Sequence, residues 1–178
     1  MQRQCVILVD GSNAYATAKH LGYSVDYKKV LEECDIPVLK AFYFTALIEG
    51  QVSFVQPLVD YLSYNNWTTV TKPASEFLDP ITGRMKIKGN MDIEIATIAF
   101  EMAQLPQVTD LYLFSGDGDF RYMIESLQRR YGLRVTVVST IQTKPPMCSD
   151  VLRRQADTFL DMADANVRKV IEHIKKER

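Results

Sequence analysis

The chain has 178 residues, 47% of them hydrophobic, and a formal net charge of −1 at pH 7. This composition suits one globular domain with a sizeable core. The balanced charge excludes a global basic field, so a polyanion would be held by local patches or through metal ions. The first residues lack the apolar segment of a signal peptide, and no stretch approaches the roughly 20 apolar residues of a membrane span. We therefore expect no membrane partner.

Apolar strand-like runs alternate with helical patterns along the chain, which predicts βαβ units and an α/β fold with a mostly parallel sheet. Strands are predicted over residues 5–9, 38–46, 67–71, 111–114 and 134–138. Helices are predicted over residues 13–21, 26–34, 52–64, 91–103 and 120–131, with a final helical region capped by Ser149 and reaching Met162.

The segment 73–89 is rich in turn signals and is expected to form a loop or a small hairpin. It leads into Arg84-Met-Lys-Ile-Lys-Gly89, the densest basic stretch before the tail. Residues 1–165 are expected to form a single domain, and residues 166–178 a charged helical extension.

Cysteine and histidine are scarce in this sequence. Cys5, Cys34 and Cys148 are odd in number and widely spaced, so neither a disulfide framework nor a Cys-x-x-Cys metal site is available. Neither His20 nor His173 lies near the acidic motifs described next, which argues against zinc chemistry. A reducing cytoplasm is the expected location.

Two of the apolar runs end in carboxylates. Asp10 follows the first run, and Asp117 and Asp119 follow the fourth. Because sites in an open parallel sheet form beyond the carboxyl ends of the strands, we expect both groups at the same edge. Two carboxylates about 5 Å apart repel each other by roughly 3 kcal/mol at an effective dielectric of about 20. A hard divalent cation such as Mg²⁺, which prefers oxygen ligands, would offset that cost.

A further carboxylate opens the predicted helix over residues 91–103. Asp92 shares a helix face with Ile95, Ala96 and Ala99, so it is expected to point towards the sheet. Buried carboxylates are rarely left without a partner. Glu94 lies on another face and is expected to be solvated.

Each acidic residue also has a simpler explanation when it is taken alone. Asp10 could be a turn residue and Asn13 a helix cap, while Asp92 could cap its own helix. Asp117 and Asp119 could accept hydrogen bonds from the backbone of a turn. The convergence of four carboxylates at one edge favours a metal site over these separate explanations.

Three motifs in order resemble the NYN domain family of PIN-like nucleases over roughly residues 4–165. They are Asp10-Gly-Ser-Asn13, Lys88-Gly-Asn-Met-Asp92 and Ser115-Gly-Asp-Gly-Asp-Phe120. The segment Ala156-Asp157-x-Phe159 is similar to the closing helix motif of that family. The resemblance implies a Rossmann-like three-layer α/β/α sandwich and a metal-dependent ribonuclease.

The resemblance also assigns expected roles to residues. Asp10, Asp92, Asp117 and Asp119 match the metal-binding acidic positions. Asn13 matches the polar residue of the first motif, and Ser115 matches a small polar residue that orients a carboxylate or water. One or two Mg²⁺ or Mn²⁺ ions would activate water and steady the leaving oxygen. The lack of a nearby histidine favours a metal-bound hydroxide as the base.

Contacts to the substrate are expected from basic and aromatic side chains. The predicted phosphate contacts are Lys86, Lys88, Arg84 and Lys72, although a solvated hairpin face explains these cations equally well. Tyr15 and Phe120 could stack on bases, but Phe120 fits better as a core anchor. RNA is favoured over DNA by the resemblance alone.

Two other functions stay open at this point. The chain could be a catalytically weak regulatory module that binds RNA, or a protein partner or second copy through residues 168–178. It could also be a phosphohydrolase for small phosphate esters. The last is disfavoured because Ser12 stands two residues after Asp10, where a phosphoaspartyl enzyme usually carries a second carboxylate.

Overall fold

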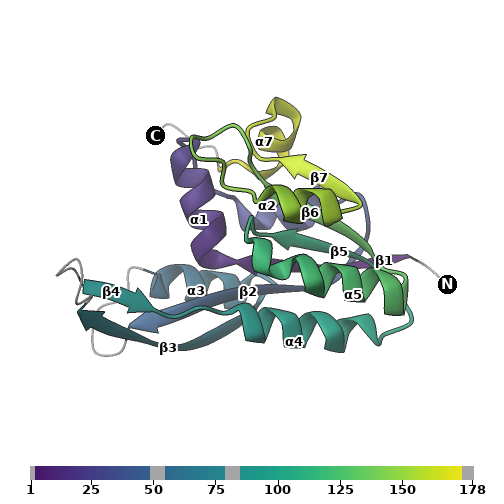
Figure 1. Cartoon of the computed structure of the whole chain (residues 1–178), viewed down its shortest axis with the longest axis horizontal. Helices are drawn as coiled ribbons and strands as arrows, with labels where there is room; N and C mark the ends of the chain where they lie inside the picture. Colours follow the sequence, from purple (N-terminus) through teal and green to yellow (C-terminus); the bar gives the residue numbers. More distant parts are fainter. Residues whose placement is uncertain (1–2, 49–54, 79–84, 174–178) are drawn as a thin grey trace.

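A computed structural model describes residues 3–48, 55–78 and 85–173. Within these residues, seven strands form one sheet in the order β4-β3-β2-β1-β5-β6-β7 (Figure 1). All neighbouring strands run parallel except β4, which is antiparallel to β3. The strands are β1 (Gln4–Asp10), β2 (Val38–Ile48), β3 (Thr68–Leu78), β4 (Met85–Lys88), β5 (Val108–Phe114), β6 (Arg134–Ser139) and β7 (Thr158–Asp161).

Helices cover both faces of the sheet, which makes a three-layer α/β/α sandwich as predicted. One face packs against α1 (Gly11–His20), α2 (Tyr27–Glu32), α3 (Gln56–Tyr64) and α7 (Ala165–Ile171). The other packs against α4 (Asp92–Ala103), α5 (Arg121–Tyr131) and α6 (Asp150–Gln155), and a short 3-10 helix, η1 (Gly118–Phe120), precedes α5.

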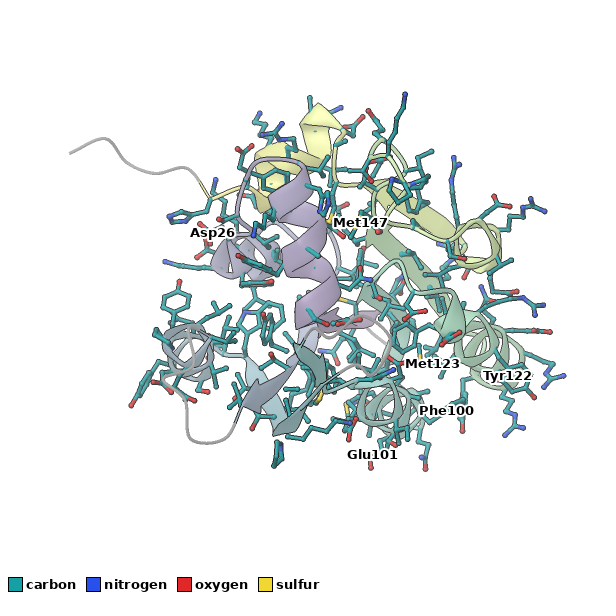
Figure 2. The ribbon with its side chains drawn as sticks, turned by 60° about the vertical axis from the view of Figure 1, so that its left-hand side comes forward. Asp26, Phe100, Glu101, Tyr122, Met123 and Met147 are labelled. Atoms are coloured by element: carbon teal, nitrogen blue, oxygen red, sulfur yellow. The ribbon has the colours of Figure 1, made fainter. Side chains whose placement is uncertain are left out.

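Alternation along β1 explains how one strand serves two cores. Val6 and Leu8 face the α4–α5 side, whereas Ile7 and Val9 face the α1–α2 side. A strand that is buried on both faces has a continuous run of apolar residues, which is why β1 could be predicted from the sequence. On α5, Met123 is buried and Tyr122 points away from the core (Figure 2).

The predicted final helical region is wrong beyond Gln155. α6 ends there, and Thr158–Asp161 forms β7, which pairs in parallel with β6. Asp157 begins this change of direction, because its Oδ2 accepts hydrogen bonds from the backbone N of Val135 and from Gln128 Nε2. Ser149 stands at the predicted N-cap position, but its side chain makes no capping hydrogen bond.

The predicted third strand is too short. β3 continues to Leu78, and its last four residues pair with β4 to form the hairpin expected in the segment 73–89. Residues 79–84 of that hairpin lie outside the described residues. The hairpin matters for the site because its second strand leads directly into α4.

The C-terminal helix α7, part of the predicted extension, packs against α2. The backbone N of Asp26 donates to the carbonyl of Ile171 at 2.7 Å, and Val25 forms an isolated antiparallel bridge with Glu172. Ile171 itself is buried. Among the helices of the described ranges, none has the length and apolar character needed to cross a bilayer.

Candidate metal site at the carboxyl end of the sheet

The candidate site lies where the connections of the sheet change direction. From β1 the chain adds β2 and β3 on one side, and β5, β6 and β7 on the other. Such a topological switch point opens a crevice beyond the carboxyl ends of the two central strands. Asp10 is the last residue of β1, and Ser115 directly follows β5.

Two hydrogen bonds tie the first and third acidic motifs together across this crevice. Ser115 Oγ donates to Asp10 Oδ2 at 3.2 Å, and the backbone N of Gly116 donates to Asn13 Oδ1 at 3.0 Å. Asn13 is therefore a link between two strand ends rather than the helix cap that the sequence also allowed. The cap of α1 is Asp10, whose side chain accepts from the backbone N of Asn13.

Three carboxylates converge at this edge. Asp92, Asp117 and Asp119 each offer one oxygen, and these oxygens all lie within 4.8 Å of one another. At that spacing each like-charged pair costs about 3 kcal/mol at an effective dielectric of about 20. Carboxylate oxygens are the ligands that Mg²⁺ and Mn²⁺ prefer. The donor set therefore fits a hard divalent cation.

Asp10 stands beside this group of three without belonging to it. It lines the same pocket, of about 300 Å³, as Asp92 and Asp117. The Asp10 side chain is only 8% exposed, and Ser12 Oγ also donates to it at 2.9 Å. These bonds fix the Asp10 carboxylate in place at the wall of the pocket.

Burial and neighbouring charges change the pKa of Asp92. Burial raises the pKa of Asp92 above its ordinary value, a hydrogen bond from Asn90 opposes the shift, and the negative charges of Asp117, Asp10 and Asp119 add to it. Because part of this rise in pKa comes from neighbouring negative charges, a cation placed among the carboxylates would stabilise the ionised form of Asp92.

Asn90 is a site residue that the sequence did not single out. Its Nδ2 donates to Asp92 Oδ2 at 2.5 Å, and its Oδ1 accepts from the backbone N of Asp92 at 2.6 Å. Asn90 also lines the pocket. The available signal was its place two residues before Asp92 in Lys-Gly-Asn-Met-Asp, where a polar side chain can bond to its own neighbours.

The loop that carries Asp117 is built around a glycine. A Cβ at Gly116 would lie 2.0 Å from the carbonyl oxygen of Met147, so no larger residue fits beneath that segment. The backbone N of Ser149 donates to the carbonyl of Gly116 at 2.9 Å, which holds the two segments together. Asp117 Oδ1 accepts a hydrogen bond from the backbone N of Asp119 at 3.0 Å. Asp117 therefore also has the turn-forming role that the sequence allowed.

The structure describes only some of the side chains that were predicted to contact the substrate. Lys72 Nζ forms an ion pair with Glu94 at 2.9 Å, so Glu94 is not the solvated charge expected from the sequence. Lys86 and Lys88 lie in β4, but their side chains and all of Arg84 fall outside what the structure describes. Tyr15 is exposed on α1, and Phe120 is buried as a core anchor.

Comparisons with known proteins agree with this architecture. The model of the NYN domain family matches residues 4–176. The low amplitude and bright protein LabA of Synechococcus elongatus is 33% identical over 175 residues, which cover 96% of this chain and 88% of that protein. A crystal structure of VPA0982 from Vibrio parahaemolyticus, a protein of unknown function, matches with a TM-score of 0.73 and 27% identity, over 92% of this chain and 94% of that one.

Proposed function

The chain belongs to the NYN domain family, and from this membership we propose that it is a metal-dependent ribonuclease that hydrolyses RNA phosphodiester bonds. The observation that carries the proposal is the group of Asp92, Asp117 and Asp119, whose oxygens lie within 4.8 Å of one another. Asp10 lines the same pocket.

Asp92, Asp117 and Asp119 would hold Mg²⁺ or Mn²⁺, with Asp10 contributing from the wall of the pocket. The ion when bound lowers the pKa of water and stabilises a leaving oxygen. Polar residues in and beside the pocket act by positioning. Asn90 fixes the Asp92 carboxylate, and Ser115 fixes that of Asp10. Asn13 holds the backbone of Gly116 against α1. A preorganised set of this kind loses little free energy to rearrangement when substrate binds.

The charge balance supports RNA binding through the site rather than over a broad surface. The chain carries a net charge of −1, so its carboxylates would repel phosphates unless cations neutralise them. Lys86, Lys88 and Arg84 precede Asp92 in the sequence and are proposed to contact the phosphates beside the scissile bond. Lys72 would join them only by giving up its ion pair with Glu94.

The test is cleavage of labelled single-stranded and structured RNA in Mg²⁺ or Mn²⁺ against EDTA. Wild type is compared with Asp117→Asn and with Glu101→Gln, which changes an exposed carboxylate elsewhere on α4 (Figure 2). We expect metal-dependent cutting by wild type and Glu101→Gln and a loss of at least about 100-fold in Asp117→Asn.

Two outcomes would contradict the proposal. Equal cutting by all three proteins would identify a contaminating nuclease. No cutting by any of them, on either kind of RNA, would favour a regulatory module that binds RNA or protein without catalysis.

A further inference from the structure

A pair of thiols lies near the start of β1, away from the carboxylates. Cys5 is fully buried in β1, and Cys34 is half-buried in the connection between α2 and β2. Their sulfur atoms are 3.6 Å apart. Asp10 follows Cys5 by five residues, so at about 3.3 Å per residue the thiols are roughly 16 Å from that end of the strand. The pair is therefore separate from the proposed nuclease site.

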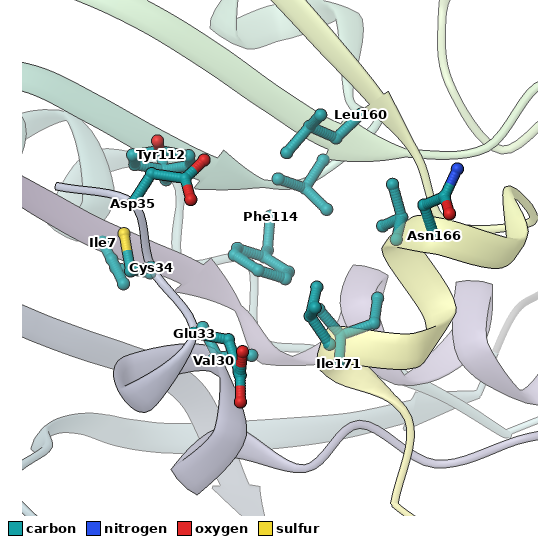
Figure 3. Close-up of a pocket in the computed structure, with 13 residues that line it drawn as sticks. Ile7, Val30, Glu33, Cys34, Asp35, Tyr112, Phe114, Leu160, Asn166 and Ile171 are labelled. Carbon is teal, nitrogen blue, oxygen red and sulfur yellow. The ribbon is translucent and has the colours of Figure 1, made fainter.

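A pocket gives small molecules a route to one of the two thiols. Cys34 lines a cavity of about 220 Å³ between the sheet, α2 and α7 (Figure 3). Phe114 lies at its centre, with Leu160 and Ile171 on the far walls (Figure 3). Cys5 does not line this cavity and is covered by the core. A dissolved reagent would thus meet Cys34 before Cys5.

The surroundings of the two thiols shift their pKa values in opposite directions. A hydrogen bond with Cys5 lowers the pKa of Cys34 to about 7, burial opposes this, and hydrogen bonds from the Ile36 backbone and the Tyr112 side chain add to the lowering, against the charge of Asp35. The hydrogen bond with Cys34 and burial raise the pKa of Cys5. The thiolate is the reactive form of cysteine. Near neutral pH, Cys34 is therefore the nucleophile and Cys5 keeps its proton.

We propose that Cys34 and Cys5 form a reversible oxidation site that consumes a peroxide. In the first step the Cys34 sulfur attacks an oxygen of hydrogen peroxide. The S–O bond forms and the O–O bond breaks, so the sulfur is oxidised to the sulfenic acid, and the departing hydroxide takes up the proton that Cys34 released on ionisation and leaves as water. In the second step the Cys5 sulfur attacks the Cys34 sulfur. The S–S bond forms, the S–O bond breaks, and the Cys5 proton leaves with the hydroxide as a second water.

Forming the disulfide requires a small movement, and Cys34 lies outside the helices and strands. A disulfide requires the sulfurs to approach from 3.6 Å to about 2.05 Å. Cys5 is held in the centre of the sheet by β2 and β5, whereas Cys34 lies between elements. The bond would close the chain between residues 5 and 34, which restricts the unfolded state and raises the melting temperature.

Cys148 serves as an internal comparison. Burial raises the pKa of Cys148 to about 11, and its sulfur donates to the backbone oxygen of Ser149. It is buried and, within the described part of the chain, contacts neither of the other sulfurs. Cys34 should therefore react with iodoacetamide at least about tenfold faster than Cys148.

The experiment treats the full chain with hydrogen peroxide and measures its intact mass and a non-reducing peptide map. Wild type should lose about 2 Da, gain a linked Cys5–Cys34 peptide, and return to its starting mass with dithiothreitol. Cys148→Ala should behave identically, and Cys34→Ala should form no link. Cys5→Ala should gain about 16 Da at Cys34, which a 1,3-dione reagent would capture.

Three results would overturn the proposal. The first is wild type that keeps all three thiols after peroxide treatment. The second is oxidation of Cys148 at the rate of Cys34. The third is wild type that gains oxygen at Cys34 without the link, because Cys5 would then fail to resolve the intermediate. The wild-type peptide map decides these points even if Cys5→Ala folds poorly, and none of them depends on RNA cleavage.

Discussion

Ser115 Oγ donates a 3.2 Å hydrogen bond to Asp10 Oδ2 and thereby joins the carboxyl ends of β1 and β5. The same hydroxyl accepts a hydrogen bond of 3.2 Å from the backbone N of Asp117. Ser115 is only 1% exposed, so a buried hydroxyl makes both bonds. One buried hydroxyl therefore sets the spacing between a pocket carboxylate and the loop that carries two more.

Replacing Ser115 with Ala should lower the free energy of unfolding by about 1–3 kcal/mol, because two polar groups lose a partner inside the protein. Urea unfolding measures this loss. Ser139→Ala is the matched control, since Ser139 is equally buried at the end of β6 and its hydroxyl has no hydrogen-bond partner among the described residues. That control should be neutral or stabilising, and equal losses in the two variants would contradict the role given to Ser115.

Divalent metal should stabilise the protein in thermal unfolding. A ligand that binds only the folded state adds about 2.7 kcal/mol at 100 times its Kd, so Mg²⁺ or Mn²⁺ should raise the Tm of wild type. Asp92→Asn should lose most of this shift and should be more stable than wild type in EDTA, because the mutual repulsion is relieved. Glu101→Gln should keep the wild-type shift. An unchanged metal response in Asp92→Asn would argue against a cation at this cluster.

Asn90→Ala should weaken metal binding about tenfold, in the range seen when a group that orients a metal ligand is removed. The Asp92 carboxylate would lose the Nδ2 bond that orients it, while α4 stays folded. Isothermal titration with Mn²⁺ measures the affinity, and circular dichroism checks the fold. Gln104→Ala removes an exposed amide at the other end of α4 and should bind Mn²⁺ as wild type does. Equal affinities in the two variants would leave Asn90 without a positioning role.

Arg3→Ala should reduce stability at neutral pH and much less in acid. Arg3 Nε and Nη2 donate to the two oxygens of the buried Asp110 at 2.7 and 2.5 Å. Burial pushes the pKa of Asp110 up, but hydrogen bonds from Arg3 and Thr109 outweigh it and hold the pKa below its ordinary value. In the unfolded chain the pKa of an aspartate is about 3.9. The ionised Asp110 therefore adds to the free energy of unfolding above that pH, and this stabilisation is lost as the pH falls through the lower pKa that Asp110 has in the folded protein.

Urea unfolding at pH 7 and pH 3 tests the Arg3 prediction. The variant should unfold at a lower urea concentration than wild type at pH 7, and the loss should be modest because Arg3 is half-exposed. The difference from wild type should shrink at pH 3. Arg129→Ala, which removes an exposed cation on α5, is the control and should change little at either pH. A loss that is constant between the two pH values would show that Arg3 acts through packing alone.

The parts of this fold that the sequence predicts are those set by burial. Residues 5–9 of β1 and 111–114 of β5 form continuous apolar runs because both strands lie inside the sheet with helices on each face, and the parallel arrangement then brings their carboxyl ends to one edge. α4 was recognisable because Ile95 and Ala99 recur on the buried face. The structure accordingly brings Asp92, Asp117 and Asp119 together, while their roles remain predictions.

The parts that could not be predicted depend on long-range contacts or on very short elements. β7 has four residues at the edge of the sheet, and its apolar side chains continue the helical spacing of α6. Lys72 and Glu94 are 22 positions apart and meet only because β3 runs past the start of α4. Asn90 bonds to its own neighbour, so its importance appears only once Asp92 is known to line a pocket.

The docking of α7 on α2 has a consequence for how the chain is made. Tyr27 and Val30 leave the ribosome long before Val167 and Ile171, which later pack into the same hydrophobic cluster. The carboxylates are all synthesised by residue 119, yet one face of the sheet lacks its last cover for about 50 residues more, which at about 5–20 residues per second is several seconds. During that interval the nascent chain presents an apolar surface, so a chaperone that shields such surfaces would find its target before the fold is complete.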